Sequence, residues 1–431
     1  MSRVLVLATT TGYQTRAFGE AAERLGVDLV FATDRCHMIE DPWRDQAIPI
    51  RFHDEAAAVA DILASAVHRP LDGILVVGDR PTVIGARAAH ALGLPGHSAE
   101  AAGIARNKQR TRERLQDAGL PVPWFAATTI AADPREVARS IRYPAVVKPV
   151  ALSGSRGVMR VDDADAFVAA FSRLRTLLQS PDIRAERNDA HDSVLVEGFI
   201  PGREYALDGL LHHGVLHVLA LFDKPDPLDG PFFEETIYLT PSAATSGESG
   251  AIVDAVTRAA AAIGLEHGPV HAECRVNDDG VFVLEVAARP IGGLCARALR
   301  FVKRGRESLP AQSPISLEEL LLRHSLGESP DKWGRESFAS GVMMIPIPHR
   351  GVFRRADGVE EARAVAGIDD VRVTAKPDQL LIPLPEGASY LGFIFARAGT
   401  PAQVEQALRA AHARLEFSFD PELRVVQSAH G

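Results

Sequence analysis

The chain has few cysteines, no excess of basic residues and no long hydrophobic run, and each shortage excludes a class of protein. Its three cysteines (Cys36, Cys274 and Cys295) form no Cys-x-x-Cys pair, which is typical of a protein with reduced thiols. The formal net charge of −9 argues against a nucleic-acid surface, which needs clustered lysine and arginine. No window approaches the roughly 18 apolar residues of a membrane span, and the N-terminus lacks the features of a signal peptide. We therefore expect a cytoplasmic protein that binds neither nucleic acid nor membrane.

Two well-known nucleotide-binding fingerprints are also missing. Neither G-x-G-x-x-G nor G-x-x-x-x-G-K-[ST] occurs, so the common dinucleotide and Walker A phosphate loops are excluded. Internal repeats and low-complexity tracts are absent too. What the chain does have is 431 residues with 46% apolar composition, which is enough for two or three domains with real cores.

Alternating apolar strands and helices characterise the first hundred residues. The runs RVLVLA, VDLVFAT and DGILVVGDR are separated by helical segments, a pattern that predicts a parallel sheet covered on both faces. Such sheets bind ligands at the carboxyl ends of their strands. The loops at residues 9–13 (TTTGY) and 78–80 (GDR) are therefore candidates for lining a pocket.

From about Ser98 the pattern changes to α+β with antiparallel hairpins. A charged helix capped by Asn107 comes first, and later strands follow in pairs, such as the two joined at residues 212–214. A proline, serine and glycine-rich passage covers about 307–337, and a last unit contains three strands and a helix. We predict an N-terminal domain at 1–98, two α+β units at 99–195 and 196–330, and a C-terminal unit at 331–431.

The hairpin at residues 271–289 carries unusual charges. If Asp278, Asp279 and Gly280 form a three-residue loop, Val281 pairs with Asn277, and Glu285 lies opposite Glu273. One face then carries the apolar residues Val270, Ala272, Cys274, Val276, Phe282, Leu284, Val286 and Ala288. The other face carries the residues His271, Glu273, Arg275, Glu285, Ala287 and Arg289.

Two carboxylates placed directly opposite each other destabilise a sheet unless a positive charge lies between them. One interpretation is an ion-pair ladder in which Arg275 and Arg289 supply that charge. The other is a divalent cation held by Glu273 and Glu285. Oxygen ligands without histidine or cysteine favour Mg²⁺, which usually shares its ligand shell with phosphates.

Candidate phosphate and nucleotide contacts lie upstream of the hairpin. Lys148 ends a buried strand just before a loop with flexible backbone, whose relevant residues are Ser153, Gly154, Ser155 and Gly157. Lys108 begins the charged helix. Glu197 and Glu204 flank a short apolar segment that suits a purine, with Glu197 at the amino edge and Glu204 at the ribose. Considered singly, these features are also typical of a β-turn, a lysine that reaches solvent and a solvated helix face.

In their joint order these segments resemble the ATP-grasp superfamily. NKQRTRERLQDAGLPVPW, YPAVVKPVALSGSRGV, VLVEGFIPGREY and HAECRVNDDGVFVLEVAARPIGG are most similar to its carboxylate–amine ligases of the L-amino-acid ligase (bacilysin synthetase-like) type. The resemblance spans the chain and is strongest over 105–295. It implies an N-terminal parallel-sheet α/β domain followed by two α+β subdomains that clamp a nucleotide.

The resemblance also implies roles for individual residues. Lys108 and Lys148 would contact ATP phosphates beneath the flexible loop from Ser153 to Gly157. Glu197 and the backbone near Phe199 and Ile200 would hold adenine, and Glu204 the ribose. Glu273 and Glu285 would ligate Mg²⁺, with Mn²⁺ as an alternative. Arg289 would face the transferring phosphate and, with Lys148, act in catalysis.

The implied activity is ATP-dependent formation of an amide or peptide bond through an acyl phosphate, with release of ADP and phosphate. Small carboxylates and amines would be the substrates, and His271, Arg289, Glu234 and Glu235 are candidate substrate contacts. A homodimer is one assembly that the sequence leaves open. Other ATP-grasp chemistry, carboxylase-like or in nucleotide biosynthesis, and a non-catalytic nucleotide-binding module are the alternatives.

One position departs from the superfamily pattern. Many members carry an asparagine two residues after the second metal-binding glutamate, as a further ligand, and here that position is Ala287. This departure leaves the number of metal ions and the composition of the metal shell open, and it keeps the non-catalytic alternative in view.

Overall fold

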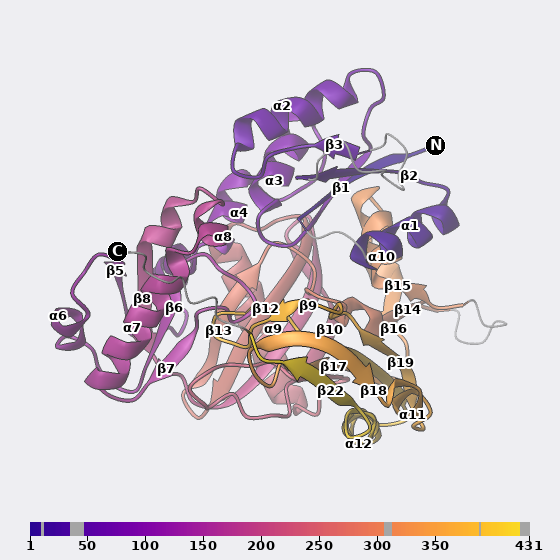
Figure 1. The fold of residues 1–431 in the computed structure, drawn as a ribbon. Coiled ribbons are helices and arrows are strands. Elements are labelled where there is room, and N and C mark those ends of the chain that lie inside the picture. The colour runs from indigo at the N-terminus through magenta and orange to yellow at the C-terminus, as the bar shows by residue number, and fades with distance from the viewer. Residues whose placement is uncertain (10–12, 35–46, 306–312, 388, 423–431) are drawn as a thin grey trace, which may run out of the picture.

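The computed structural model describes residues 1–431 except 10–12, 35–46, 306–312, 388 and 423–431. Figure 1 shows an N-terminal unit at the top, a smaller sheet with its helices at the left, and a large sheet-centred body that includes the C-terminal strands. The chain is thus a multidomain α/β and α+β protein, as the sequence predicts.

The N-terminal unit is a parallel sheet with the strand order β3-β2-β1-β4. Its elements are β1 (Arg3–Ala8), α1 (Tyr13–Leu25), β2 (Asp28–Thr33), β3 (Ala47–Pro49), α2 (Glu55–Ala66), β4 (Gly73–Val77) and α3 (Thr82–Ala91). The central strand β1 is buried from Val4 to Leu7 because helices cover both faces of the sheet. The carboxyl end of β4 leads into the GDR loop and faces the rest of the molecule. Most of the TTTGY loop lies outside the described residues.

Two helices lead into the second unit, an antiparallel sheet with the order β5-β8-β6-β7. The elements are α4 (Ala99–Ala105), α5 (Lys108–Asp117), β5 (Phe125–Thr129), α6 (Pro134–Ala138), β6 (Ala145–Pro149), β7 (Met159–Val161), α7 (Ala164–Leu178), α8 (Pro181–Arg184) and β8 (Ser193–Gly198). The predicted cap of α5 is confirmed, because the Asn107 side chain accepts the Arg110 N–H at 3.0 Å. Helix α7 buries Phe167 and Phe171 against the sheet.

An eight-stranded sheet with the order β13-β12-β9-β10-β11-β17-β21-β19 forms the centre of the molecule. Its strands are β9 (Arg203–His212), β10 (Val215–Asp223), β11 (Ile237–Thr240), β12 (Gly268–Asn277), β13 (Gly280–Ala287), β17 (Ala339–Ile345), β19 (Ile368–Val373) and β21 (Gly392–Ala398). Helix α9 (Ser246–Ile263) packs on β9, β12 and β13, and α12 (Pro401–His412) packs on β11, β17 and β21. Glu273 pairs with Ala206, whose side chain belongs to the core on the face opposite α9.

The pairing predicted for the hairpin is confirmed at its functional end and wrong near its turn. Glu273 lies opposite Glu285, and His271 lies opposite Ala287. However, Asn277 pairs with Gly280 and Val276 with Val281, so the loop has two residues rather than three. A β-bulge between Glu273 and Cys274 absorbs the difference.

The bulge also corrects the predicted distribution of side chains on β13. Val283 pairs with Cys274 and lies in the core under α9, whereas Phe282 pairs with Arg275 on the opposite face. Phe282 and Leu284 are therefore only partly buried and do not belong to the apolar face assigned to them. Period-two alternation fails here because a bulge shifts it by one residue.

The proline, serine and glycine-rich passage at about 307–337 contains regular structure. It includes α10 (Leu317–Ser325), and β15 (Ile315–Ser316) and β16 (Trp333–Arg335) flank β14 (Arg300–Lys303) in a small sheet. Helix α10 buries Leu317, Leu320 and Leu321 in the largest core and packs against α1 of the N-terminal unit (Figure 1). A second small sheet contains β18 (Gly351–Asp357), β20 (Leu380–Leu381) and β22 (Glu416–Asp420), with α11 (Val359–Arg363) after β18.

The domain boundaries stay predictions. Residues 195 and 196 both lie within β8, and the eight-stranded sheet contains strands from both sides of residue 330. Among the described residues, no helix combines the length and the apolar character needed to cross a membrane. Cys274 and Cys295 are buried thiols without a disulfide partner, whereas Cys36 lies outside the described residues.

Candidate active site

A buried lysine organises the carboxylates of the central sheet. Lys224, which follows β10 directly, donates to Glu204 at 2.8 Å, Glu235 at 2.5 Å and Glu273 at 2.8 Å. One oxygen from each carboxylate lies within 4.8 Å of the others. The Tyr238 hydroxyl adds a hydrogen bond to Glu235 at 2.7 Å. Lys224 is the cation that all three carboxylates share, whereas Arg275 pairs with Glu204 alone among them, at 2.9 Å, and Arg289 pairs with Asp79.

The protonation states in this cluster follow from burial and from the lysine. Burial raises the pKa of Glu235 to about 7, and the neighbouring Glu273 adds to this effect against the opposing charge of Lys224. Burial also favours a protonated Glu273, but Lys224 and His271 outweigh it and hold the Glu273 pKa well below its usual range. Burial would lower the pKa of Lys224, yet the surrounding carboxylates raise it well above its ordinary value. Lys224 is thus permanently charged at neutral pH.

Glu285 faces a different cation from its partner across the hairpin. Its Oε2 lies 3.4 Å from Nζ of Lys108, and that ammonium also donates to the Leu152 carbonyl at 2.6 Å. Lys108 therefore connects the first turn of α5, the start of the glycine-rich loop and β13. This contact places Lys108 next to the acidic face of the hairpin, while its predicted role at the ATP phosphates stays a prediction.

Glu197 forms a buried ion-pair network with two cations. Its carboxylate accepts a hydrogen bond from Lys148 and is held by Arg112 in a bidentate pair, with Nε at 2.9 Å and Nη2 at 3.3 Å. Arg112 is only 1% exposed and also donates to the Val283 carbonyl at 3.0 Å. It thus joins α5, β8 and β13 through a single side chain.

The same network shifts the pKa values of its members. Burial opposes the ionised form of Glu197, but Arg112 and Lys148 outweigh it and lower the pKa to about 2. For Lys148, burial is the larger effect and lowers the pKa to about 8 in spite of Glu197. Lys148 is therefore charged at neutral pH but loses its proton at a pH where an exposed lysine would keep it.

The glycine-rich loop is tied to the C-terminal unit. Gly154, Ser155 and Gly157 have positive φ angles of 64°, 54° and 76°. The Gly157 N–H donates to the Pro385 carbonyl at 2.7 Å, and Arg156 donates to the Glu386 carbonyl at 2.8 Å. The left-handed backbone explains the need for glycine here. The contacts with residues 385–386 were not predicted.

Arg289 is fixed by a carboxylate from the N-terminal unit. Its Nε donates to Asp79 at 2.8 Å and its Nη1 to the Pro290 carbonyl at 3.0 Å, and the residue is 8% exposed. Burial opposes the guanidinium charge, but Asp79 outweighs it and raises the Arg289 pKa. The GDR loop, a predicted pocket-lining loop, thus reaches this site through Asp79.

His271 on β12 lies between the carboxylates of Asp208, on the neighbouring strand β9, and Glu273 on its own strand. Its Nδ1 is 3.4 Å from Asp208, and its Nε2 is 3.9 Å from Glu273. Burial would lower the pKa of His271, but Asp208 and Glu273 raise it to about 9, so the imidazole is cationic at neutral pH. It therefore adds positive charge next to the acidic cluster.

Aromatic and guanidinium groups pack around the short apolar segment that was predicted to hold a purine. The Phe199 ring lies 4.2 Å from the Arg160 guanidinium carbon and stacks with Phe233 at 6.4 Å between ring centroids. The Phe199 N–H donates to the Pro144 carbonyl, and the Ile200 carbonyl accepts from Arg275 at 2.7 Å. Both oxygens of Glu204 are engaged, by Lys224 and by Arg275. The roles predicted for Phe199, Ile200 and Glu204 stay predictions.

Four residues of this region were not predicted from the sequence. Lys224 stands in the segment already noted for Glu234 and Glu235, so its sequence neighbourhood was a usable signal. Asp79 was anticipated only as part of a loop. Nothing in the local sequence indicated a site role for Arg112 on a charged helix or for Asp208 in an apolar strand. The partners of both residues are distant in sequence.

The donor set fits a magnesium ion. It consists of carboxylate oxygens surrounded by lysine, arginine and cationic histidine, without a thiolate. Hard oxygen donors are the ligands that Mg²⁺ prefers, and the cations suit the phosphates with which Mg²⁺ usually binds.

Comparison with known proteins identifies the family. Residues 141–298 match the model of the ATP-grasp domain, residues 19–96 that of the ATP-grasp N-terminal domain, and residues 343–420 that of the L-amino acid ligase C-terminal domain 2. The chain contains an ATP-grasp domain together with an ATP-grasp N-terminal domain. The resemblance read from the sequence is confirmed at this level, including the L-amino acid ligase type of the C-terminal part.

Individual relatives give a more detailed picture of this ATP-grasp chain. The crystal structure of an L-amino acid ligase from Bacillus licheniformis has a TM-score of 0.81 and 29% identity, over 97% of this chain and 99% of that one. The alanine–anticapsin ligase of Bacillus subtilis is 27% identical over 257 residues, which are 56% of this chain and 53% of that protein. The ATP-grasp enzyme fsqD of Aspergillus fumigatus is 30% identical over 282 residues, which are 61% of this chain and 46% of that protein. The chain spans about half the length of these two curated relatives.

A more distant structure defines the limit of this likeness. Phosphoribosylglycinamide synthetase from Anaerococcus prevotii has a TM-score of 0.66 at 14% identity, over 97% of this chain and 100% of that one. At this identity the match supports the ATP-grasp fold alone. It carries no information about the substrate.

Proposed function

We propose that this ATP-grasp protein is an ATP-dependent carboxylate–amine ligase that joins an amino acid or small carboxylic acid to an amine. The observation that carries the proposal is the set of charges on one face of the β12–β13 hairpin. Glu273 pairs with Lys224 at 2.8 Å, and Glu285 pairs with Lys108 at 3.4 Å. The buried Arg289 lies two residues after the end of β13. The similarity to L-amino acid ligases supports the same conclusion.

Two lysines and a loop are proposed to bind the phosphates of ATP. Lys148 is charged at neutral pH, and Lys108 lies beside Glu285. The loop residues Ser153, Gly154 and Ser155 offer backbone N–H groups, and Gly157 fixes the end of the loop through its own N–H bond to Pro385. Glu197, Phe199 and Ile200 would hold the adenine, and Glu204 the ribose. The stacked Phe199 and its guanidinium neighbours support this assignment, because such walls bind the faces of purine rings.

Glu273 and Glu285 are the proposed ligands of Mg²⁺, and Glu235 is close enough to Glu273 to contribute another oxygen. When bound, Mg²⁺ would neutralise charge on the transferring phosphoryl group. Lys224 and His271 supply fixed positive charge that lets the carboxylates lie close together. This compensation supports a working site despite Ala287, which lacks the amide oxygen found at that position in many relatives.

The proposed reaction has two steps. An oxygen of the substrate carboxylate attacks the γ-phosphorus of ATP, the bond to the β-phosphate oxygen breaks, and ADP leaves. The amine nitrogen then attacks the acyl carbon, the carbon–oxygen bond to phosphate breaks, and the departing phosphate takes up the proton lost by the amine. Arg289 would stabilise the negative charge of the phosphoryl group, and Lys148 would orient it.

Water must be kept from the acyl phosphate, since it hydrolyses readily. The loop around Gly157 is well placed for this role because it is held from both sides, by β6–β7 and by residues 385–386. Glu234 and Glu235 are proposed to meet the substrate amine.

The test is a screen for phosphate release over pairs of amino acids with ATP and Mg²⁺, followed by mass spectrometry of the product. We expect release that depends on both substrates, and its loss in Glu285→Gln and Arg289→Ala. Glu361→Gln on exposed helix α11 is the matched control and should keep wild-type turnover. Near-normal turnover of either site variant would contradict the residue assignment. Nucleotide binding without release for any pair would contradict the ligase proposal and favour a non-catalytic module.

A further inference from the structure

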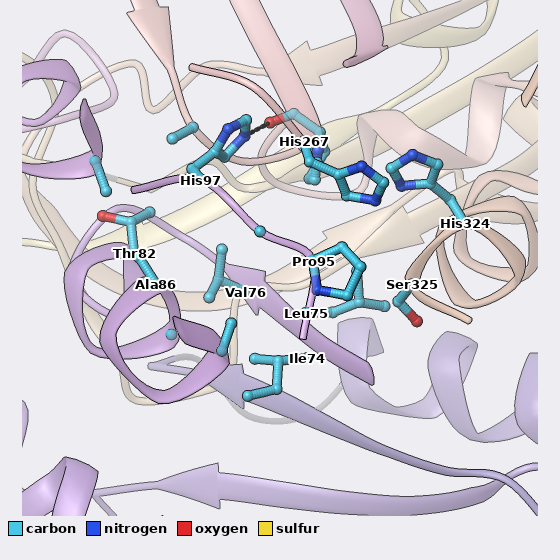
Figure 2. A pocket seen from close by; sticks show the side chains of 17 residues that line it. Ile74, Leu75, Val76, Thr82, Ala86, Pro95, His97, His267, His324 and Ser325 are labelled. Carbon is cyan, nitrogen blue, oxygen red and sulfur yellow. Dashed lines mark hydrogen bonds between the residues drawn. The ribbon is translucent and has the colours of Figure 1, made fainter. Parts of the chain in front are cut away.

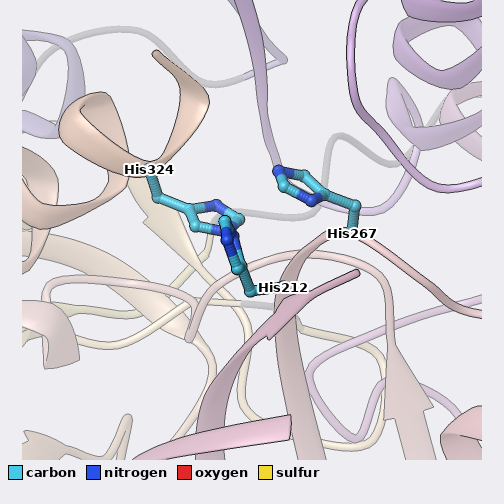
Figure 3. Close-up of side chains that lie close together, drawn as sticks. All are labelled: His212, His267 and His324. Atoms are coloured by element: carbon cyan, nitrogen blue, oxygen red, sulfur yellow. The ribbon is translucent and has the colours of Figure 1, made fainter. Parts of the chain in front are cut away.

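Three histidines from distant parts of the chain meet outside the proposed nucleotide site. His212 ends β9, His267 immediately precedes β12, and His324 lies on α10 (Figure 3). One ring nitrogen from each lies within 4.8 Å of the others. Because His267 and Glu273 are six residues apart along an extended chain, the cluster lies about 20 Å from the acidic site.

The cluster borders the junction between the N-terminal unit and the central sheet. Figure 2 shows His267 and His324 facing each other in the wall of a small cavity whose other side includes Ile74 and Pro95. The cavity has a volume of about 50 Å³. Two of the three histidines, His267 and His324, therefore line a cavity at this junction.

The hydrogen-bonding capacity of these side chains is largely unused. His267 is 7% exposed, and among the described residues neither of its ring nitrogens has a hydrogen-bond partner. His324 is 2% exposed, and its Nε2 lies 3.3 Å from Nδ1 of His212. Buried polar atoms without partners cost about 1–3 kcal/mol each. A ligand that accepts nitrogen lone pairs would remove this cost.

The rings are neutral, so their lone pairs are available. Burial lowers the pKa of His267 to about 4 and that of His324 to about 3, and the neighbouring histidines add to the effect. Metal binding at neutral pH would therefore displace no proton from these two imidazoles.

We propose that His212, His267 and His324 form a binding site for a transition-metal ion with a preference for imidazole nitrogen, of which Zn²⁺ is the leading case. Two imidazole nitrogens bound tetrahedrally at about 2.0–2.1 Å from zinc lie roughly 3.3 Å apart. That separation equals the 3.3 Å between His212 and His324. A rotation of the His267 ring completes the set of three, and the ring of His213, 5.0 Å from that of His267 between centroids, stands beside it.

A metal ion at this position would have a structural role. It would link β9, β12 and α10, and α10 packs against α1 and β4 of the N-terminal unit. The fit between these units is close, because a Cβ on Gly73 would approach the Ser325 carbonyl oxygen to 2.7 Å. The bound metal would therefore stabilise the attachment of the N-terminal unit to the central sheet.

The experiment uses the full-length chain without a polyhistidine tag, stripped with a chelator and kept in excess Mg²⁺ so that oxygen-ligand sites are filled. Zn²⁺ is titrated by calorimetry and Co²⁺ by visible absorption. We expect one ion per chain, intense Co²⁺ bands typical of tetrahedral nitrogen coordination, and a rise in the thermal midpoint on adding Zn²⁺.

Three variants locate the ion. His212→Gln, His267→Gln and His324→Gln should weaken binding by more than the roughly 10- to 100-fold that loss of an outer-shell partner costs. His68→Gln, on an exposed loop residue, should leave binding unchanged. His212 is only partly buried, so its variant keeps the test valid if the two core variants fail to fold, as judged by circular dichroism.

Absence of one-to-one binding by the wild-type chain would overturn the proposal. Wild-type affinity in the His212→Gln variant would do so too, because the ion would then be adventitious and bound elsewhere.

Discussion

At the scale of single residues, the least expected feature is a lysine that holds three carboxylates. Lys224 has a side chain that is 3% exposed and contacts Glu204, Glu235 and Glu273 at once. From the sequence, the charges of Glu273 and Glu285 were expected to be balanced either by Arg275 and Arg289 or by a divalent cation. The structure adds Lys224 from the end of a neighbouring strand, and its three-dimensional position shows that this lysine reaches all three carboxylates.

Replacing Lys224 should therefore destabilise the fold. In Lys224→Met the buried Glu204 and the half-buried Glu235 and Glu273 lose their common counter-ion, and we expect the free energy of unfolding to fall by about 3–5 kcal/mol at neutral pH. Urea denaturation measures this change. Added Mg²⁺ should restore more stability to this variant than it adds to the wild type, because the cation can replace the lost charge. Lys332→Met, at an exposed position, is the control and should change stability by no more than about 0.5 kcal/mol. An unaltered unfolding curve for Lys224→Met would contradict the network.

Lys148 predicts a pH dependence. Burial lowers its pKa to about 8 although Glu197 acts in the opposite direction. Its charged form is the one proposed to bind phosphate, so kcat/KM for ATP should fall as pH rises through about 8, with a tenfold loss per pH unit beyond. In Lys148→Arg the guanidinium stays charged, and this alkaline limb should disappear even if turnover is lower. A flat profile for the wild type up to about pH 10 would exclude Lys148 from this role.

At the scale of elements, the β12–β13 hairpin shows what a sequence can and cannot specify. Its charged face and the pairing of Glu273 with Glu285 were predictable from alternation. Strands β1, β2 and β4 were predictable from their apolar runs and the cap of α5 from Asn107, whereas the short strand β3 was missed. The bulge was not, because an extra residue in one strand leaves no mark in the alternation of a short segment. Helix α10 was not predicted, because the stretches on both sides of it are rich in proline, serine and glycine.

The glycine-rich loop shows a contact between elements that are far apart in sequence. Arg156 and Gly157 bond to the carbonyls of Glu386 and Pro385, and the Glu386 carboxylate is held by Arg173 of α7. Nothing local in residues 153–157 predicts a partner more than two hundred positions away. The C-terminal unit thus helps to hold the loop that is proposed to cover the phosphates.

Removing the Glu386 charge should loosen this loop. Because the Arg173–Glu386 pair is largely exposed, Glu386→Gln should cost at most about 1 kcal/mol, which corresponds to an about two- to fivefold faster amide hydrogen exchange over residues 152–158. Hydrogen-exchange mass spectrometry measures this directly. The control is Arg355→Gln, whose partner Asp357 lies on the same exposed strand β18, and it should leave the loop unchanged. Equal loop exchange in wild type and Glu386→Gln would show that the contact does not restrain the loop.

At the scale of the whole molecule, the candidate site requires several units at once. Lys148 and Glu197 come from the antiparallel four-stranded sheet, and Asp79 comes from the N-terminal unit. The carboxylates Glu204, Glu273 and Glu285 come from the central sheet. The sequence predicted the members of this site mostly one by one. Their mutual arrangement follows from long-range packing, which is why Asp79, Arg112 and Asp208 were found only in the structure.

Asp79 gives a test of this assembly. In Asp79→Asn the Arg289 guanidinium loses the charge that orients it, and we expect kcat to fall by about 10²-fold with little change in KM for ATP. Arg289 is 8% exposed and keeps its hydrogen bond to Pro290, so the fold should survive, as thermal unfolding can verify. Asp72→Asn, before β4 and away from the site, should retain wild-type kcat. A wild-type kcat in Asp79→Asn would mean that the N-terminal unit does not position Arg289.

The proposed function depends on one step, the transfer of phosphate from ATP to the substrate carboxylate. The most direct test follows oxygen-18 from the labelled carboxylate of an accepted substrate during turnover with ATP and the amine. If an acyl phosphate forms, one labelled oxygen stays on phosphorus when the amine displaces phosphate, so the released inorganic phosphate carries a single oxygen-18 and ADP carries none. Release of unlabelled phosphate together with a labelled product would contradict the formation of an acyl phosphate.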